Sequence, residues 1–226
     1  MVLKIENLTV KLPTGADREF AIEDVSLNVD KGEIVCVVGE SGSGKSVTAF
    51  TIMGLIPRKE LTPTAGKILL EGEDLLSKDN NEMRKFRGSK IGMIFQEPMT
   101  ALNPVMKVGK QIEELLTIHT KHNEQERKKI ILEAMDAVKL PDPTKIFNTY
   151  PHQLSGGQRQ RIMIAMALVL EPNLLIADEP TTALDVTTQA EVLALVKEIQ
   201  RIKGMGVLFI THDFGVVADI ADRVVV

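Results

Sequence analysis

The stretch Gly39–Ser46 constrains the fold of this chain more than any other, because it reads Gly-Glu-Ser-Gly-Ser-Gly-Lys-Ser and fits the spacing G-x-x-x-x-G-K-S. The apolar run Glu33–Val38 before it is typical of a strand buried on both faces, and a helix is expected from about Lys45 to Leu55. In this setting successive backbone N–H groups point into one concavity that binds phosphate oxygens, and the helix N-terminus adds positive potential. A glycine-rich turn without a ligand is the alternative, and a dinucleotide fingerprint is disfavoured because Val47 stands where that pattern needs glycine.

The remaining periodicity favours an α/β domain. Residues 2–10 and 20–30 alternate apolar and polar side chains and are expected to form antiparallel strands, with a further strand at Gly66–Glu71. Residues 108–140 repeat apolar side chains at helical spacing. Short apolar runs predict further strands at Lys90–Phe95, Leu174–Ala177 and Val207–Thr211. The second and third of these strands are each expected to be followed by a helix. Strands that alternate with helices imply a mostly parallel sheet.

Composition disfavours several classes of function. The net charge of −4 gives no electrostatic support to non-specific nucleic-acid binding, and aromatic residues make up only 4% of the chain. No apolar stretch approaches the roughly 18 residues that span a bilayer, so any role at a membrane is expected to depend on a partner. Cys36, the only cysteine, lies in an apolar run and is expected to be a buried, inert thiol, as in a cytosolic protein.

Both ends of the chain carry strand-like patterns. Met1–Glu6 lacks the layout of a signal peptide and is expected to form a strand. Asp222–Val226 stops within what is expected to be a buried strand. The sequence is therefore expected to be a fragment of a longer chain.

Polar residues at strand ends complete a candidate phosphate site. Lys45 is expected to reach the β- and γ-phosphates of a nucleotide, and the Ser46 hydroxyl is expected to bind Mg²⁺. Asp178 follows the apolar run Leu174–Ala177 and matches the Walker B pattern, in which the Asp holds Mg²⁺ through water. Glu179 is assigned as the general base that orients the attacking water, and a solvated acidic strand end is the alternative.

Two further residues follow strands in the same way. Gln96 ends the strand expected at Lys90–Phe95, where it can bind Mg²⁺ and sense the γ-phosphate. His212 follows Val207–Thr211, where it can hydrogen-bond the γ-phosphate and position Glu179. Alone, either residue would be interpreted as structural, and the order of the motifs favours function. The residues assigned to the nucleotide are Gly39, Glu40, Ser41, Gly42, Ser43, Gly44, Lys45, Ser46, Val47 and Gln96, with Glu179, His212 and Lys45 as catalytic residues and Ser46, Gln96 and Asp178 as metal ligands.

A second anion site is expected at Leu154–Gln158, which reads Leu-Ser-Gly-Gly-Gln. Its Ser and Gln have the capping-box spacing S-x-x-[EQ] at the start of a helix, and a plain helix cap is the alternative. Its two glycines leave no side chain to keep a phosphate from the free N–H groups. Because Gly39–Ser46 already supplies one phosphate site, the second is expected to serve the nucleotide of a partner in a head-to-tail dimer. The residues assigned to this contact are Ser155, Gly156, Gly157 and Gln158.

These motifs, in this order and over nearly the whole chain, resemble the nucleotide-binding domains of ATP-binding cassette (ABC) transporters. The resemblance implies an ATPase with ATP and Mg²⁺ bound, and one ABC ATP-binding domain over residues 1–226. The expected fold is α/β: a P-loop NTPase (RecA-like) core with an N-terminal antiparallel β-subdomain over 1–96 and 156–226, and an inserted α-helical subdomain over 97–155. The resemblance also identifies Ala183, Leu184 and Asp185 as the D-loop, which contacts the partner across the dimer.

Three segments narrow the resemblance to the ATPases of importers for oligopeptides, dipeptides or nickel: Gln96–Pro104, Tyr150–Gln153 and Ala177–Asp185. This implies membrane permease subunits as partners, a solute-binding protein acting indirectly, and a peripheral location on the cytoplasmic side of the cell membrane. Residues 97–110 are expected to contact a permease, and a plain surface loop is the alternative. An exporter ATPase, a soluble ABC protein of DNA repair or translation, and a module that binds without hydrolysis are the other readings.

Two features depart from the family's pattern. Leu12 stands where these domains place an aromatic residue against adenine, and Phe20, the nearest aromatic, is expected to pack within its strand, so GTP stays an alternative to ATP. The C-terminal extension usual in the peptide and nickel group is absent from residues 1–226. The resemblance is compatible with several cargoes, and with either a second copy or a related chain as the partner.

Overall fold

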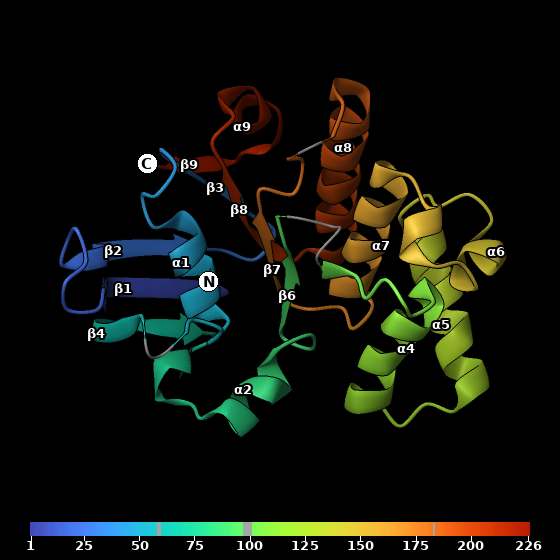
Figure 1. Cartoon of the computed structure of the whole chain (residues 1–226), viewed down its shortest axis with the longest axis horizontal. Helices are drawn as coiled ribbons and strands as arrows, with labels where there is room; N and C mark the ends of the chain where they lie inside the picture. The colour runs from blue at the N-terminus through green and yellow to red at the C-terminus, as the bar shows by residue number, and fades with distance from the viewer. Residues whose placement is uncertain (58–59, 97–100, 183) are drawn as a thin grey trace.

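The computed structural model describes residues 1–57, 60–96, 101–182 and 184–226, and its strands form two sheets (Figure 1). The antiparallel sheet has the order β2-β1-β4-β5, with β1 (Leu3–Lys11), β2 (Phe20–Val29), β4 (Thr62–Leu70) and β5 (Glu73–Asp74). The parallel sheet has the order β6-β7-β8-β3-β9, with β3 (Ile34–Val38), β6 (Ile91–Ile94), β7 (Leu174–Asp178), β8 (Gly206–Thr211) and β9 (Arg223–Val225). The predicted α/β fold, with antiparallel strands at the N-terminus, is confirmed.

Helices connect the parallel strands and lie on both sides of the sheet (Figure 1). Those on the N-terminal part are α1 (Lys45–Ile52), the short 3₁₀ helix η1 (Leu75–Ser77) and α2 (Asn80–Phe86). Those between β6 and β7 are α4 (Val108–His119), α5 (Glu124–Ala137), α6 (Pro143–Phe147), the 3₁₀ helix η2 (Pro151–Gln153) and α7 (Gly156–Leu168). The last two are α8 (Val186–Lys203) and α9 (Phe214–Ile220).

The helical pattern over 108–140 resolves into two helices, because the segment between them carries its own end signals. α4 ends at Thr120, whose extended backbone breaks the helix. Asn123 then begins α5 with a capping box: its side chain accepts from the backbone N–H of Glu126, and the Glu126 carboxylate accepts from the N–H of Asn123.

The C-terminal strand differs from the expectation. β9 pairs with β3 alone and lies at the edge of the parallel sheet, where Val224 is exposed and its neighbours are half-buried. The expectation of a buried strand at Asp222–Val226 was therefore wrong. A run of three valines is compatible with either position, since the apolar pattern does not encode which strand lies outermost.

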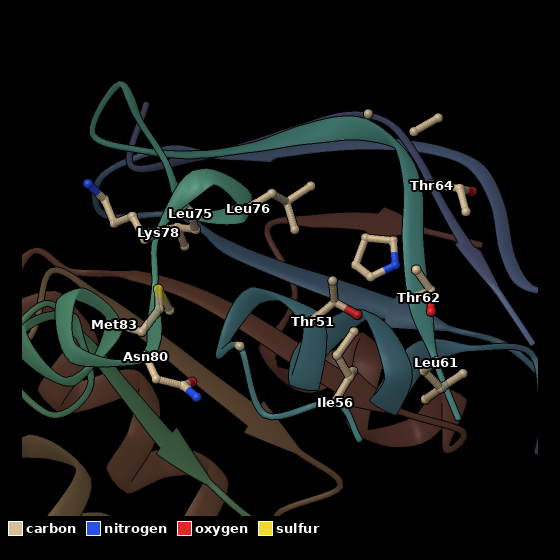
Figure 2. Close-up of a pocket in the computed structure, with 14 residues that line it drawn as sticks. Thr51, Ile56, Leu61, Thr62, Thr64, Leu75, Leu76, Lys78, Asn80 and Met83 are labelled. Atoms are coloured by element: carbon tan, nitrogen blue, oxygen red, sulfur yellow. The ribbon is translucent and has the colours of Figure 1, made fainter. Parts of the chain in front are cut away.

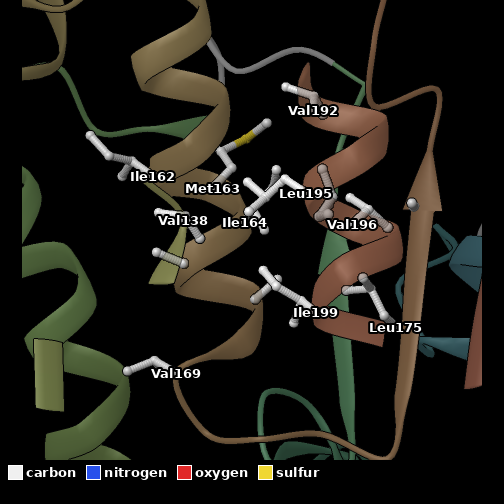
Figure 3. Close-up of a cluster of buried hydrophobic side chains, with 14 of the residues drawn as sticks. Val138, Ile162, Met163, Ile164, Val169, Leu175, Val192, Leu195, Val196 and Ile199 are labelled. Atoms are coloured by element: carbon white, nitrogen blue, oxygen red, sulfur yellow. The ribbon is translucent and has the colours of Figure 1, made fainter. Parts of the chain in front are cut away.

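The central strands divide their side chains between two hydrophobic clusters. On β7, Leu175 and Ala177 face the cluster that contains α7 and α8, whereas Leu174 and Ile176 face the cluster beneath the antiparallel sheet and α1. β3 and β8 alternate in the same way, as strands buried on both faces must. Figure 3 shows the first cluster, with Ile164 of α7 and Leu195 of α8 facing each other. The parallel sheet is thus the shared layer between two cores.

Candidate functional site

The loop Gly39–Ser46 connects β3 to α1, as expected. Gly42 and Gly44 have φ angles of 82° and 96°, a left-handed conformation that favours glycine. A Cβ on Gly44 would come within 2.6 Å of the carbonyl oxygen of Ala21, so the start of β2 packs directly against the loop. These glycines therefore permit both the turn of the loop and its close contact with the antiparallel sheet.

Two cationic side chains donate to carbonyls of this loop. The Lys45 ammonium is buried and donates to the carbonyl oxygens of Gly39 and Glu40, both at 2.7 Å. Arg18, on the exposed connection between β1 and β2, donates to the carbonyl of Gly42 at 2.7 Å. The loop thus carries concentrated positive charge, which suits an anion. Arg18 was not predicted, because no periodic signal links the connection to a loop 24 residues away.

The other residues assigned to this loop lie at its surface or its base. Glu40, Ser41, Gly42 and Ser43 are exposed, and Val47 is partly buried against the cluster beneath the antiparallel sheet. The loop tip is therefore accessible while its helix is anchored.

Asp178 ends β7 beside the first turn of α1. Its carboxylate is buried, and Oδ1 accepts a hydrogen bond from the Ser46 hydroxyl at 3.1 Å. Burial raises the pKa of the Asp178 carboxyl, while the hydrogen bond from Ser46 and the nearby charge of Lys45 oppose that rise. A desolvated carboxylate beside a hydroxyl is a pair of oxygen ligands suited to Mg²⁺, which commonly takes only one or two protein ligands when it also binds phosphates.

The Glu179 carboxylate contacts side chains from three separate segments. Its Oε1 lies 3.0 Å from Nδ1 of His212, and its Oε2 accepts from Nε2 of Gln96 and from the Thr182 hydroxyl, each at 3.0 Å. The Glu179 backbone has a φ of 46°, a left-handed conformation that is unusual for a residue with a side chain. Gln96, His212 and Glu179 are thus brought together because each follows a parallel strand, and such strands end at the same edge of the sheet. Thr182 was not predicted as part of this group.

Leu154–Gln158 lies at the start of α7. The Ser155 hydroxyl accepts from the backbone N–H of Gln158 at 3.2 Å, and the Gln158 side chain accepts from the N–H of Ser155 at 3.0 Å, so the predicted capping box is confirmed. Ser155 and Gly156 are exposed. α1 and α7 pack into different clusters on opposite faces of the parallel sheet, and Figure 1 shows them on its two sides.

The segment after Thr182 connects Glu179 to α8. Ala183 lies outside the described residues. Leu184 is half-buried, and Asp185 caps α8: its Oδ1 accepts from the backbone N–H of Thr188 at 3.0 Å and its Oδ2 from the Thr188 hydroxyl at 2.7 Å. These hydrogen bonds from Thr188 lower the pKa of the Asp185 carboxyl.

The surface expected at 97–110 is described only from residue 101 onward, so Glu97–Thr100 lie outside the described residues. Leu102 is buried, whereas Val105 is 82% exposed. The Gln111 side chain holds this connection by bonding the backbone N–H and C=O of Asn103, both at 2.9 Å. An exposed apolar side chain is therefore presented on a fixed loop.

The structure also describes Leu12 and Phe20, the two residues considered above for contact with the nucleobase. Leu12 is half-buried, and its N–H donates to the carbonyl of Glu19 at 2.9 Å, which closes the hairpin between β1 and β2. Phe20 opens β2 opposite Lys11 and is half-buried, as expected for a residue packed in its strand.

One cavity lies away from this site. It has a volume of about 500 Å³ and lies between β4, α1 and α2, with Thr51, Leu61, Leu76 and Met83 among its lining (Figure 2). None of the residues assigned to the site lines it. Within residues 1–57, 60–96, 101–182 and 184–226, no group of three or more His, Cys, Asp or Glu side chains is arranged to hold a metal by itself.

Hydropathy adds one finding. None of the described helices combines the length and the apolar character needed to cross a bilayer.

Cys36 is a buried free thiol, as predicted, and burial raises its pKa to about 12.

Known structures resemble the whole fold. The chain aligns with the dimeric structure of MJ0796, a bacterial ABC transporter cassette, with a TM-score of 0.85 and 33% identity over 99% of this chain and 93% of that one. A second structure of MJ0796, described as a post-hydrolysis state bound to ADP and Pi, aligns equally well, with a TM-score of 0.85. These matches support the predicted P-loop NTPase core.

Sequence comparison agrees with the fold. The chain is 52% identical over 225 residues both to the oligopeptide transport ATP-binding protein OppD and to the dipeptide transport ATP-binding protein DppD of Bacillus subtilis (strain 168). All of the chain is covered, and it spans 63% of the length of OppD and 67% of that of DppD. The family model described as ABC transporter matches residues 22–182. The resemblance is thereby confirmed: this chain belongs to the ABC transporter family.

Proposed function

We propose that this chain is the ATP-hydrolysing subunit of an ABC importer that takes up oligopeptides or dipeptides. The observation that carries the proposal is its 52% identity, along its whole length, to proteins named for oligopeptide and dipeptide transport. Those names favour peptides over nickel, and ATP over GTP despite Leu12, while a relative 51% identical over 230 residues and named for peptide import favours import over export. Residues 1–96 and 156–226 form the ATPase core, and 97–155 the helical subdomain.

The nucleotide phosphates bind at Gly39–Ser46, with Gln96 at their outer end. Lys45 exchanges its bonds to loop carbonyls for bonds to the β- and γ-phosphates, so the ammonium stays hydrogen-bonded throughout. Ser46 and Asp178 hold Mg²⁺, with Gln96 as a further ligand; the buried carboxylate beside the hydroxyl supports this pairing. Held by these residues, Mg²⁺ would neutralise part of the negative charge of the phosphates.

Glu179 acts as the general base. A water oxygen attacks the γ-phosphorus, the bond to the β-phosphate oxygen breaks, and the Glu179 carboxylate takes the proton from the water, which leaves ADP and phosphate. His212 holds the carboxylate through the 3.0 Å contact to Oε1 and lies at the same sheet edge as the γ-phosphate.

Ser155–Gln158 contributes to the site of a partner ATPase subunit, either a second copy or a related chain. The exposed capping box supports this, because its free N–H groups can bind a phosphate brought by another molecule. Leu184 and Asp185, with Ala183, lie on the segment expected to contact that partner. The dimeric state of the similar MJ0796 cassette supports such an arrangement.

Permease subunits bind the helical subdomain, with residues 97–110 as the contact, and a solute-binding protein delivers the cargo to them. Val105 at 82% exposure is the apolar side chain available for that contact. The subunit is then peripheral, on the cytoplasmic side of the membrane.

Hydrolysis is tested with Glu179→Gln in the assembled transporter. The amide cannot take a proton, so ATP is expected to bind while steady turnover falls to background, and the ATPase dimer is expected to persist with ATP bound. Measured phosphate release at the wild-type rate would show that Glu179 is not the base.

The partner contact is tested by mixing variants. Ser155→Arg is expected to retain ATP binding and lose hydrolysis, whereas Ser155→Ala, which loses only the cap, is expected to retain part of it. If the sites are shared, mixing Ser155→Arg with Lys45→Ala restores one intact site per mixed dimer, and hydrolysis returns in part. No recovery in the mixture would argue against a site shared between two copies of this chain.

A further inference from the structure

The carboxylate of Glu179 is bound by side chains from three separate segments. Gln96 follows β6, His212 follows β8, and Thr182 lies on the turn that leaves β7; each bond is 3.0 Å long. The Glu179 side chain is only 16% exposed, whereas that of His212 is 62% exposed. Gln96 and His212 are exposed and reach Glu179 from the surface, whereas Thr182 is half-buried and follows Glu179 by three residues in the chain.

Thr182 also closes the turn on which Glu179 sits. Its backbone N–H donates to the Glu179 carbonyl at 3.1 Å, and Pro180 occupies the second position of this four-residue turn, where its fixed φ is favoured. Glu179 itself is left-handed, with a φ of 46°, and its own N–H donates to the carbonyl of Ile210 on β8 at 2.9 Å. Thr182 thus makes two hydrogen bonds to the left-handed Glu179: its backbone N–H donates to the carbonyl oxygen, and its hydroxyl donates to the carboxylate.

The bonds divide unequally between the two carboxylate oxygens. Among the residues that the structure describes, Oε2 accepts from both Thr182 and Gln96, whereas Oε1 has a single contact, with His212. A carboxylate oxygen has two lone pairs directed for hydrogen bonding. In this arrangement Oε2 accepts two hydrogen bonds, and Oε1 keeps a lone pair that can accept a proton from water.

We propose that Thr182 is a positioning residue for ATP hydrolysis, whose hydroxyl occupies Oε2 of Glu179 and thereby presents Oε1 to the attacking water. The inference rests on the proposed function, since it assigns the orientation of the same base. Gln96 is exposed and shares Oε2, but of these two donors Thr182 is the one built into the turn, so its bond keeps the rotation of the carboxylate fixed when Gln96 turns toward a phosphate.

The test compares Thr182→Val with Thr182→Ser in the assembled transporter. Valine keeps the branched shape and removes the hydroxyl, whereas serine keeps the hydroxyl and removes the methyl. A hydrogen bond to a charged group is worth enough to change a rate by about tenfold or more. We expect Thr182→Val to lower kcat by about tenfold, with the KM for ATP and the affinity for a fluorescent ATP analogue changed by less than about twofold, and Thr182→Ser to recover kcat to within about threefold.

Three results would overturn the proposal: a wild-type kcat for Thr182→Val, a loss confined to KM and nucleotide affinity, or a serine variant as impaired as the valine variant. If Thr182→Val does not assemble, Thr182→Ala supplies the hydroxyl-free comparison with serine. The Glu179→Gln variant separates this inference from the function beneath it. Normal hydrolysis by Glu179→Gln would overturn both, whereas an inactive Glu179→Gln with a fully active Thr182→Val would overturn the role of Thr182 alone.

Discussion

Replacing Gly157 by alanine tests how tightly the start of α7 is fitted against α8. A Cβ at Gly157 would lie 2.8 Å from the Thr188 methyl carbon Cγ2, well inside ordinary van der Waals contact. Thr188 is not free to turn away, because its hydroxyl donates to Oδ2 of Asp185 at 2.7 Å and its backbone N–H donates to Oδ1 at 3.0 Å. The inserted methyl group therefore meets a side chain whose rotamer is fixed by a cap.

Two opposing effects set the magnitude. Overpacking of this kind costs about 1–3 kcal/mol, and replacing glycine by alanine in a helix gains up to about 1 kcal/mol. Gly157→Ala is therefore expected to destabilise the protein by about 1 kcal/mol, or about 2–4 °C in Tm for a chain of this size. Thr188→Ser removes the clashing methyl and keeps the hydroxyl for Asp185, so in that background Gly157→Ala is expected to be neutral or stabilising by up to about 1 kcal/mol.

Urea unfolding of the wild type, both single variants and the double variant gives the coupling energy between the two sites. We expect a coupling of about 1–3 kcal/mol, with the double variant more stable than Gly157→Ala. Refutation would be simple: Gly157→Ala as stable as the wild type, or equally destabilising with serine at position 188, would show that the methyl contact does not limit this position.

Three further outcomes are expected. Arg223 donates to both carboxylate oxygens of Glu33 and lowers the pKa of that carboxyl. The stabilisation by this ion pair is therefore present above the pKa of Glu33 in the unfolded chain and is lost as pH falls through its pKa in the folded protein. Glu33→Gln should cost about 1 kcal/mol at pH 7 for this partly exposed pair, and the difference in urea midpoints between variant and wild type should shrink toward pH 3. Cys36, with its pKa raised to about 12 by burial, should resist alkylation by iodoacetamide at pH 8 in the folded protein and react readily in urea, as followed by mass spectrometry. Gly109→Ala would place a Cβ 2.3 Å from the ring of Phe147 and should lower stability by at least about 2 kcal/mol, with Phe147→Leu recovering part of the loss in thermal unfolding.

Much of the fold follows from local patterns in the sequence. The period-two alternation of β1 and β2, and the short apolar runs of β3, β7 and β8, predict strands because burial on one face or on two leaves different signatures. What those patterns do not carry is the order of strands in the sheet. This is why β9 was expected to be buried although it lies at an edge.

The candidate site shows a similar division. His212 was expected to position Glu179, and Gln96 was expected at the end of another strand near the γ-phosphate; the Glu179 carboxylate lies within hydrogen-bond distance of both. Thr182 was missed because its contact depends on the left-handed backbone of Glu179, which reverses the chain within three residues. A turn of that kind is fixed by the packing around it and leaves no periodic trace in the sequence.

The alternation of side chains on β3, β7 and β8 has a consequence for how the protein tolerates change. Each of these strands separates the two hydrophobic clusters. Because both clusters are closely packed, a side chain enlarged in one cluster moves the strand backbone that also borders the other. Repacking near α8 is then felt beneath the antiparallel sheet, although the two clusters share no residue. Because the loop Gly39–Ser46 begins where β3 ends, its position depends on the packing of both clusters, and substitutions distant from it on either side of the sheet can shift it.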